Sequence, residues 1–470
     1  MNQIQSGYVC AGFESLSSLL YRFIIGKSTG IENRFNEHFT PEIIADMIPQ
    51  IISGILHSFG QDYPGRKKLG KYVAKEAQVF QLAKDEIFLS KTISYADSGG
   101  FQASIGKISK TETQSLVELY HEFLLNHSDV FDRAFLLDLP PGPDCIMFDN
   151  WKDVYDWNYK TYNMAAQLPE YVRKKMVYVH HFRTPKQWEI FNKIKNENEL
   201  FDKFNYHATG GLVSNLQSDM IIPCIAYVLP LVPLLNDCIK YKRKVLNFHV
   251  LGGANFRDIM FYEMFRKHID ETFKIELNIT YDSSGIFKSL MQGRTLHIVD
   301  ENSNSIKKTD IRSNRASKRF YDTPFTTDEY LINKLNSMAS KFNLKKLELE
   351  KIYNVDTKTL YDEVRAYAML YMLDFYSEMQ TVIRKYVNEG TYDLYKQGNI
   401  SEFNFNNINF TKYLNNGKLT KKQIVKTSVL VKSLDILTSL DEDYCAYLVN
   451  NFMAKDEVMK LNNKCDLMTC

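Results

Sequence analysis

The sequence predicts an α/β fold with a TIM-type (β/α)8 barrel, an N-terminal helical flank and a C-terminal mostly helical domain. Short apolar runs recur along the chain, and each ends at a glycine or a polar residue, as buried parallel strands do. Segments with helical periodicity lie between these runs, and the alternation indicates right-handed βαβ units. Seven such runs favour a closed barrel over an open sheet, and the sequence has no G-x-G-x-x-G or Walker motif.

Each expected strand is rich in β-branched and aromatic residues. The expected strands are Ile87–Tyr95, Ala134–Leu139, Met176–Phe182, Phe204–Ala208, Val245–Leu251, Ile275–Tyr281 and Thr295–Val299. The expected helices between them include Thr111–Leu125, Trp151–Gln167, Lys186–Lys195 and Asn255–His268. Their apolar residues recur every three or four positions, which places them on one face that can cover a sheet.

Changes of pattern divide the chain into four expected parts. These are a helical flank at 1–86, the barrel at 87–306, a basic linker at 307–324 and a helical domain at 325–470. The longest helical pattern of the last part is Leu360–Val387, and its broad apolar stripe predicts a packing face.

The bulk composition is that of an ordinary globular protein, with 44% hydrophobic and 24% charged residues. The formal net charge is only +2, so the overall charge of the molecule would not attract a nucleic acid, and any such ligand must bind to a local basic patch. No signal peptide is recognisable, and the seven cysteines include no C-x-x-C pair. We therefore expect a cytoplasmic protein with reduced thiols and no structural zinc. The proline-interrupted run Ile221–Leu235 is too short to span a membrane.

Three carboxylates follow three of the expected strands. Asp97, Asp138 and Asp282 stand at C-terminal strand tips, where a parallel barrel keeps its chemistry. Two carboxylates at one mouth can supply acid–base and nucleophilic catalysis at an anomeric carbon, and a third can accept the N1–H and N2–H groups of guanine. Each aspartate taken alone could equally cap a turn. Glycine pairs that would let a ligand approach the backbone also follow expected strands, at 99–100, 210–211 and 252–253.

These motifs resemble, in order and spacing, those of the tRNA-guanine transglycosylases and their DNA-modifying relatives. The resemblance covers roughly residues 85–300, and more faintly Tyr367–Val387. The matching segments are Asp97-Ser98-Gly99-Gly100-Phe101-Gln102, Leu137-Asp138-Leu139-Pro140-Pro141, Gly210-Gly211-Leu212, Leu251-Gly252, Tyr281-Asp282, and Lys288 and Gly293 beyond it.

The resemblance implies a role for each matching residue. Asp97 would be the general acid/base, Asp282 the nucleophile and Asp138 the residue that recognises guanine. Phe101 and Leu251 would cover the two faces of the base. The further substrate contacts that it implies are Ser98, Gln102, Gly210, Gly211 and Leu212.

Two histidines replace the family's Val-Gln-Gly segment, whose glutamine also touches the base. The segment here is Val179-His180-His181. Because adjacent strand residues point to opposite faces, only one histidine can face the mouth, and we expect it to be His180. His207 and His249 are expected to be core histidines with their hydrogen bonds satisfied.

The cysteine-rich zinc site that tRNA enzymes of this family carry after the barrel is missing here. A basic run stands in its place, although a solvated loop would have the same composition. This difference favours DNA over tRNA as the substrate, in the manner of the family members, many of them in phages, that place 7-deazaguanines in DNA. The expected nucleic-acid contacts are Lys288, Lys307, Lys308, Arg312, Arg315, Lys318 and Arg319.

The expected activity is therefore the exchange of guanine in DNA for a free 7-deazaguanine base through a covalent glycosyl-aspartate. The chemistry calls for no cofactor and no metal. The expected partners are DNA and the free base, with a homodimer or a helper protein left open, and the compartment is the cytoplasm, that of the host if a phage encodes the chain. Three alternatives stay open: a tRNA-guanine transglycosylase, a glycosidase that excises bases, and an inactive barrel subunit that binds nucleic acid.

Overall fold

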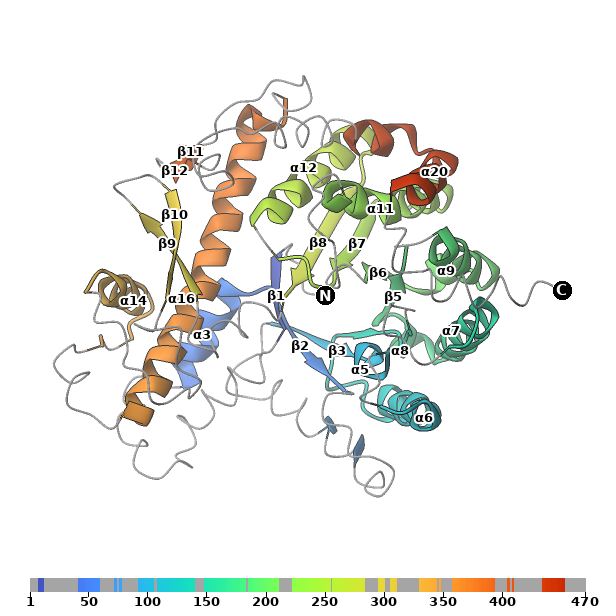
Figure 1. Ribbon diagram of the computed structural model, residues 1–470, viewed down its shortest axis with the longest axis horizontal. Helices are drawn as coiled ribbons and strands as arrows, with labels where there is room; N and C mark the ends of the chain where they lie inside the picture. The colour runs from blue at the N-terminus through green and yellow to red at the C-terminus, as the bar shows by residue number, and fades with distance from the viewer. Residues whose placement is uncertain are drawn as a thin grey trace.

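The computed structural model contains a closed barrel of eight strands in which all neighbouring strands are parallel (Figure 1). This confirms the predicted (β/α)8 barrel. The structure describes residues 7–11, 41–59, 72–73, 76–77, 92–104, 108–139, 148–182, 185–210, 222–254, 256–283, 295–300, 305–310, 329–344, 346–347, 357–393, 404–405, 408–409 and 433–452.

The barrel strands run in sequence order around the wall. They are β1 (Gly7–Ala11), β2 (Gly54–Ser58), β3 (Ile93–Asp97), β4 (Arg133–Phe135), β5 (Met176–His180), β6 (Tyr206–Thr209), β7 (Val245–Val250) and β8 (Glu276–Asp282). The helices that accompany them are α3 (Pro41–Ile51), α5 (Gly100–Ser104), α6 (Lys110–Asn126), α7 (Trp151–Ala166), α8 (Glu170–Arg173), α9 (Pro185–Glu197), α10 (Leu200–Lys203), α11 (Ile222–Lys240) and α12 (Phe256–Phe273).

The N-terminal part of the chain departs from the prediction of a helical flank at 1–86. It supplies two barrel strands, so the barrel begins at Gly7 and not at residue 87. β1 closes the barrel, because Val9 pairs with Gly54 of β2 on one side and with Asp282 of β8 on the other. Each of these strands has only five residues, too few for a clear pattern beside helical segments.

The run Thr295–Val299 was expected to be a barrel strand, and this expectation is wrong. β9 (Thr295–Asp300) pairs antiparallel with β10 (Ser305–Asp310) in a separate two-stranded sheet. Leu296 of this sheet is fully buried in the cluster that also contains the core of α16. Lys307 and Lys308 therefore lie in a strand and not in a linker, and residues 311–324 of the expected linker lie outside the described residues.

One long helix, α16 (Thr357–Tyr386), packs along the flank of the barrel beside α3 and α12 (Figure 1). The predicted packing face is confirmed where side chains are described, since Tyr367, Leu370 and Leu373 are fully buried. Arg384 near its end donates to both carboxylate oxygens of the buried Glu263 of α12, at 3.0 and 3.1 Å. The remaining C-terminal elements are α14 (Glu329–Lys341), η2 (Val387–Thr391), β11 (Asn404–Phe405), β12 (Ile408–Asn409) and α20 (Glu442–Phe452).

Small and aromatic side chains fill the inside of the barrel. They are Val9, Ala11, Leu56, Ile93, Tyr95, Phe135, Val177, Val179 and Ala208. Alternate residues along each strand face inward, so Val177 and Val179 of β5 point inside while Met176 and Tyr178 join the outer cluster against the helices. The polar residues at the barrel mouth therefore lie above an apolar barrel interior.

Candidate functional site

Asp97 ends β3 at the C-terminal mouth of the barrel, in register with Ser58 of β2. Burial is the main cause that raises the pKa of Asp97 to about 6, and the negative charges of Asp138 and Asp282 act in the same direction. The Gly99 N–H partly opposes this rise, because it favours the ionised form. The three carboxylates predicted from the strand ends thus lie close enough for their charges to interact. A carboxyl group with this pKa can give and take a proton near neutral pH.

Asp282 ends β8 and is 8% exposed. Its Oδ1 accepts a hydrogen bond from the Gly252 N–H at 2.8 Å and lies 3.3 Å from Nε2 of His249. Gly252 has φ 81°, a conformation that favours glycine and that turns its N–H toward the carboxylate. The Leu251-Gly252 segment after β7 therefore orients the aspartate of the next strand.

Asp138 stands three residues beyond the end of β4 and is 8% exposed. Its Oδ2 is hydrogen-bonded to Nε2 of His181, and the His181 side chain is 3% exposed. The other ring nitrogen of His181, Nδ1, is buried without a partner. Nδ1 is thus a polar atom that burial leaves without a partner, and leaving it unpaired is costly.

The expectation that His180 faces the mouth does not agree with the geometry. His180 lies on the outer face of β5, where its ring contacts Tyr178 edge-on at 4.4 Å between centroids and its Nε2 lies 3.4 Å from Nδ1 of His207. Burial lowers the pKa of both His180 and His207 well below the usual value, so the pair is neutral. His181 follows directly after β5, where its ring lies 4.7 Å from that of Phe191 and its Nε2 is the one that meets Asp138.

Two glycines allow segments of the mouth to approach one another closely. A Cβ on Gly100 would collide with the carbonyl oxygen of Asp138, and a Cβ on Gly210 would come within 2.8 Å of Cε1 of His181. These contacts explain why glycine follows β3 and β6 at these positions. Gly210 belongs to the predicted set, and it lies against the histidine that the sequence prediction passed over.

His249 also belongs to the site, although the prediction placed it in the core. Its ring is inside the barrel and 3% exposed, but it links Thr280 and Asp282 of β8 and does not merely fill space. The sequence could have indicated this role, because His249 stands two residues before Leu251. Residues two apart on a strand point to the same face, and Leu251 packs against the barrel interior.

The other predicted contacts are placed only in part. Ser98 is buried, and its Oγ accepts a hydrogen bond from the Gly100 N–H at 3.3 Å. Gln102 follows in α5 with a buried and unpaired Oε1, and Leu251 packs partly buried against the barrel interior. The Phe101 side chain and the residues Gly211, Leu212, Lys288, Arg312, Arg315, Lys318 and Arg319 lie outside what the structure describes.

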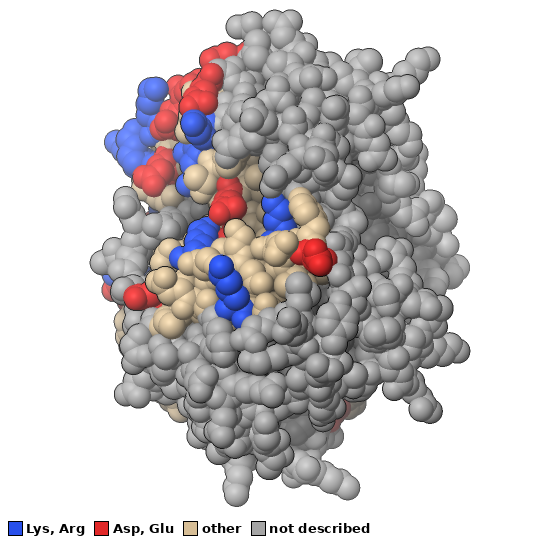
Figure 2. Space-filling model, turned by 90° about the vertical axis from the view of Figure 1, so that its left-hand side faces the viewer, with Lys and Arg blue, Asp and Glu red and all other residues tan. Residues whose placement is uncertain are grey.

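The basic run is represented in the structure by the backbone of β10 alone. Figure 2 shows the face that turns to the left in Figure 1, and on its described part Lys and Arg side chains lie among Asp and Glu side chains. Lys341 of α14, for example, is paired with Glu378 of α16 at 2.8 Å. The described part of this face therefore has charges of both signs.

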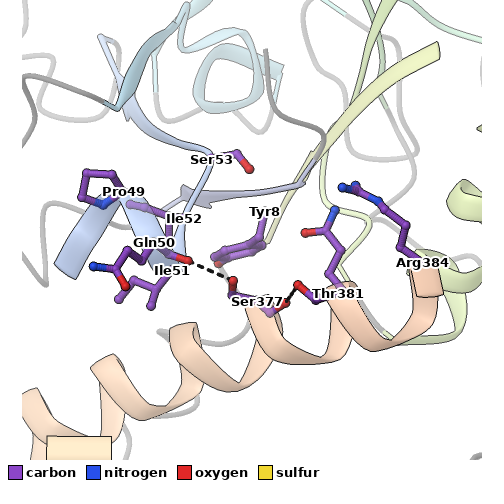
Figure 3. Close-up of a pocket in the computed structure, with 10 residues that line it drawn as sticks. Tyr8, Pro49, Gln50, Ile51, Ile52, Ser53, Ser377, Thr381 and Arg384 are labelled. Carbon is purple, nitrogen blue, oxygen red and sulfur yellow. Dashed lines mark hydrogen bonds between the residues drawn. The ribbon is translucent and has the colours of Figure 1, made fainter. Parts of the chain in front are cut away.

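A pocket of about 310 Å³ lies outside the barrel wall, between α3 and α16 (Figure 3). Tyr8, Gln50, Ser377 and Arg384 are among its lining residues, and the Ser377 hydroxyl donates to the Gln50 carbonyl at 3.0 Å. The Arg384 guanidinium is already neutralised by Glu263. This pocket is on the opposite side of β1 from the three carboxylates and does not belong to their site.

The barrel mouth thus combines a carboxyl group whose pKa is raised to about 6, a carboxylate that accepts the Gly252 N–H beside the His249 ring, and a carboxylate–histidine pair. Among the described residues, no three His, Cys, Asp or Glu side chains are arranged to hold a metal ion, and no helix is long and apolar enough to cross a membrane. The sequence matches no protein-family model, and it matches no curated protein.

Proposed function

We propose that the chain is a glycosyltransferase that exchanges guanine in DNA for a free 7-deazaguanine base of the 7-cyano-7-deazaguanine type. The observation that carries the proposal is the pair Asp97 and Asp282 at one mouth, with the pKa of Asp97 raised to about 6 and Asp282 held by N–H groups. Two carboxyl groups in such different surroundings suit an acid/base and a nucleophile.

In this reaction Asp282 attacks C1′ of a deoxyguanosine that has been flipped out of the duplex. The C1′–N9 bond breaks, its electron pair leaves with guanine, and the protonated form of Asp97 supplies the proton that guanine takes up. The Asp97 carboxylate then accepts the N9 proton of the incoming 7-deazaguanine, whose N9 attacks C1′ and releases Asp282. Two inversions at C1′ retain its configuration.

The base would be recognised by Asp138 together with His181. Asp138 is already bonded to His181, so the unpaired Nδ1 of His181 adds a second group that can meet the polar edge of the base. The choice of DNA over tRNA is supported by the absence of the family's zinc-site cysteines from the sequence.

The test is a base-exchange assay with radiolabelled guanine and with 7-cyano-7-deazaguanine, offered duplex DNA, single-stranded DNA or total tRNA. Asp282→Asn and Asp97→Asn should abolish incorporation into DNA. Asp132→Asn is the matched control, because Asp132 accepts the Ser94 N–H at the opposite end of the barrel, at 3.0 Å.

Other outcomes point to other functions. Label that enters only tRNA would identify a tRNA enzyme. Release of base without incorporation would identify a glycosidase that admits water. No reaction with any acceptor would contradict the proposed activity of the isolated chain and favour a binding subunit.

A further inference from the structure

The two carboxylate oxygens of Asp282 have different surroundings. Oδ1 accepts the Gly252 N–H at 2.8 Å and faces Nε2 of His249 at 3.3 Å. Within the described part of the chain, Oδ2 has no hydrogen bond. One oxygen is therefore held in place, and the other is free to react.

The proton of His249 can be assigned from the groups around it. Its Nδ1 lies 2.9 Å from Oγ1 of Thr280, and its Nε2 lies 3.3 Å from Oδ1 of Asp282. A carboxylate can only accept a hydrogen bond, whereas a threonine hydroxyl can donate one. The Thr280 hydroxyl then donates to Nδ1, which leaves the imidazole proton on Nε2, directed at Oδ1 of Asp282.

Packing keeps the His249 ring in this orientation. The ring contacts Phe135 edge-on at 5.1 Å and Tyr95 at 5.5 Å between centroids, and the residue is 3% exposed. A ring held on two sides by aromatic groups and bonded through both nitrogens cannot turn without breaking contacts.

We infer that His249 is a positioning residue that, together with the Gly252 N–H, holds Oδ1 of Asp282 and so directs Oδ2 to the anomeric carbon. The inference rests on the proposed function. When Oδ2 bonds to C1′ and the C1′–N9 electron pair leaves with guanine, Oδ1 becomes the carbonyl oxygen of a glycosyl ester. When N9 of the incoming base attacks C1′, the C1′–Oδ2 pair returns to the carboxylate, and negative charge reappears on Oδ1 opposite two fixed N–H donors.

His249 should therefore act mainly on the breakdown of the ester. His249→Phe keeps an aromatic ring and removes the donor, and it should slow kcat about 100-fold with little change in the KM for the free base. The covalent DNA–protein adduct should accumulate above its wild-type level. His249→Gln can place an amide N–H near the position of Nε2, and it should recover about 10-fold of the lost rate, because one donor of this kind is restored.

His207→Gln is the matched control, because His207 is a buried histidine on the neighbouring strand β6 that faces away from the mouth. It should keep kcat and the adduct level within a few-fold of wild type. Wild-type kcat and adduct level in His249→Phe would overturn the inference. Equal losses in His249→Phe and His249→Gln, without extra adduct, would also overturn it, because a mere packing role has that outcome.

A second measurement does not depend on activity. Nitrogen-15 NMR of the histidine rings in the intact protein should show the His249 Nε2 bonded to hydrogen and Nδ1 accepting a hydrogen bond. A proton on Nδ1 would overturn the inference. The proposed function fails separately, if wild-type protein forms no adduct through Asp282 and exchanges no base with any acceptor.

Discussion

Gly100 lies against the backbone carbonyl of Asp138, so closely that a β-carbon at Gly100 would collide with the carbonyl oxygen. Gly100 begins α5 three residues after Asp97, and Asp138 lies three residues after β4. The contact therefore joins the segment of the proposed acid/base to the segment of the proposed base-recognition residue. Only glycine permits this approach.

Gly100→Ala should displace one of these two segments. We expect a loss of about 1–3 kcal/mol in the free energy of unfolding, the usual cost of overpacking, and a larger proportional loss of base exchange. Chemical denaturation and the exchange assay measure the two effects. Gly7→Ala is the control, because its Cβ would meet the Ser53 side chain at the other end of the barrel. Equal activity in the two variants at equal stability would contradict the prediction.

Asp97 should make the stability of the protein depend on pH. Its pKa is about 6 in the folded protein against 3.8 in the reference state, so within this window the folded protein keeps a proton that the unfolded chain releases. The free energy of unfolding therefore falls as the pH rises from about 4 to about 6. Asp97→Asn cannot ionise, and it should gain about 1–2 kcal/mol over wild type at neutral pH, since Asp97 is partly exposed. It should gain almost nothing near pH 4.

Denaturation curves across this pH range test the prediction. The exposed Asp156→Asn, which loses a surface pair with Lys152, is the control. A constant difference between Asp97→Asn and wild type at every pH would show that Asp97 does not titrate in this window.

Asp138→Asn should lower the pKa of Asp97. The Asp138 charge is one of the causes that raise it, so removing that charge makes ionisation of Asp97 easier. Carbon-13 NMR titration of the Asp97 carboxyl group measures this directly and needs no substrate. An unchanged midpoint would mean that the two carboxylates do not interact.

His181 and His180 should differ in their effects on the binding of the free base. His181→Ala removes the partner of Asp138 together with the unpaired Nδ1, and it should raise the KM about 10-fold or more. His180→Gln changes a residue on the outer face of β5 and should leave the KM within a few-fold of wild type. A larger effect at His180 would restore the assignment based on sequence alone.

The Arg384–Glu263 pair should stabilise the docking of α16 on the barrel. Glu263 is 1% exposed, so Arg384→Met leaves a buried carboxylate with the Arg266 contact alone. We expect about 1–3 kcal/mol lower free energy of unfolding, as for a buried group that loses its charged partner. Lys385→Met, which affects only an exposed 3.8 Å pair with Glu389, should change stability by less than about 0.5 kcal/mol. Similar losses in the two variants would contradict a special role for the pair.

The class of the fold and the meeting of the three aspartates were predictable from the sequence. In a parallel barrel every strand delivers its C-terminal end to the same mouth. Asp97, Asp138 and Asp282 therefore converge even though the expected strand boundaries differ from those of β8 by one residue and from those of β3 and β4 by up to six and four residues. Long helices such as α16 were predictable for a similar reason. Their apolar residues recur over many turns, so an error of a few residues in the expected ends does not change the assignment.

Only the tertiary structure decided how the barrel closes and which histidines belong to the mouth. β1 is a strand because it pairs with β2 and β8, which are distant in the sequence, while Thr295–Val299 pairs with β10 instead. Both faces of β5 are apolar, so the sequence could not tell which of His180 and His181 meets Asp138. A shift of one residue in the strand register reverses the direction of every side chain. That register is set by pairing with strands that lie far away in the sequence, so it cannot be read from β5 alone.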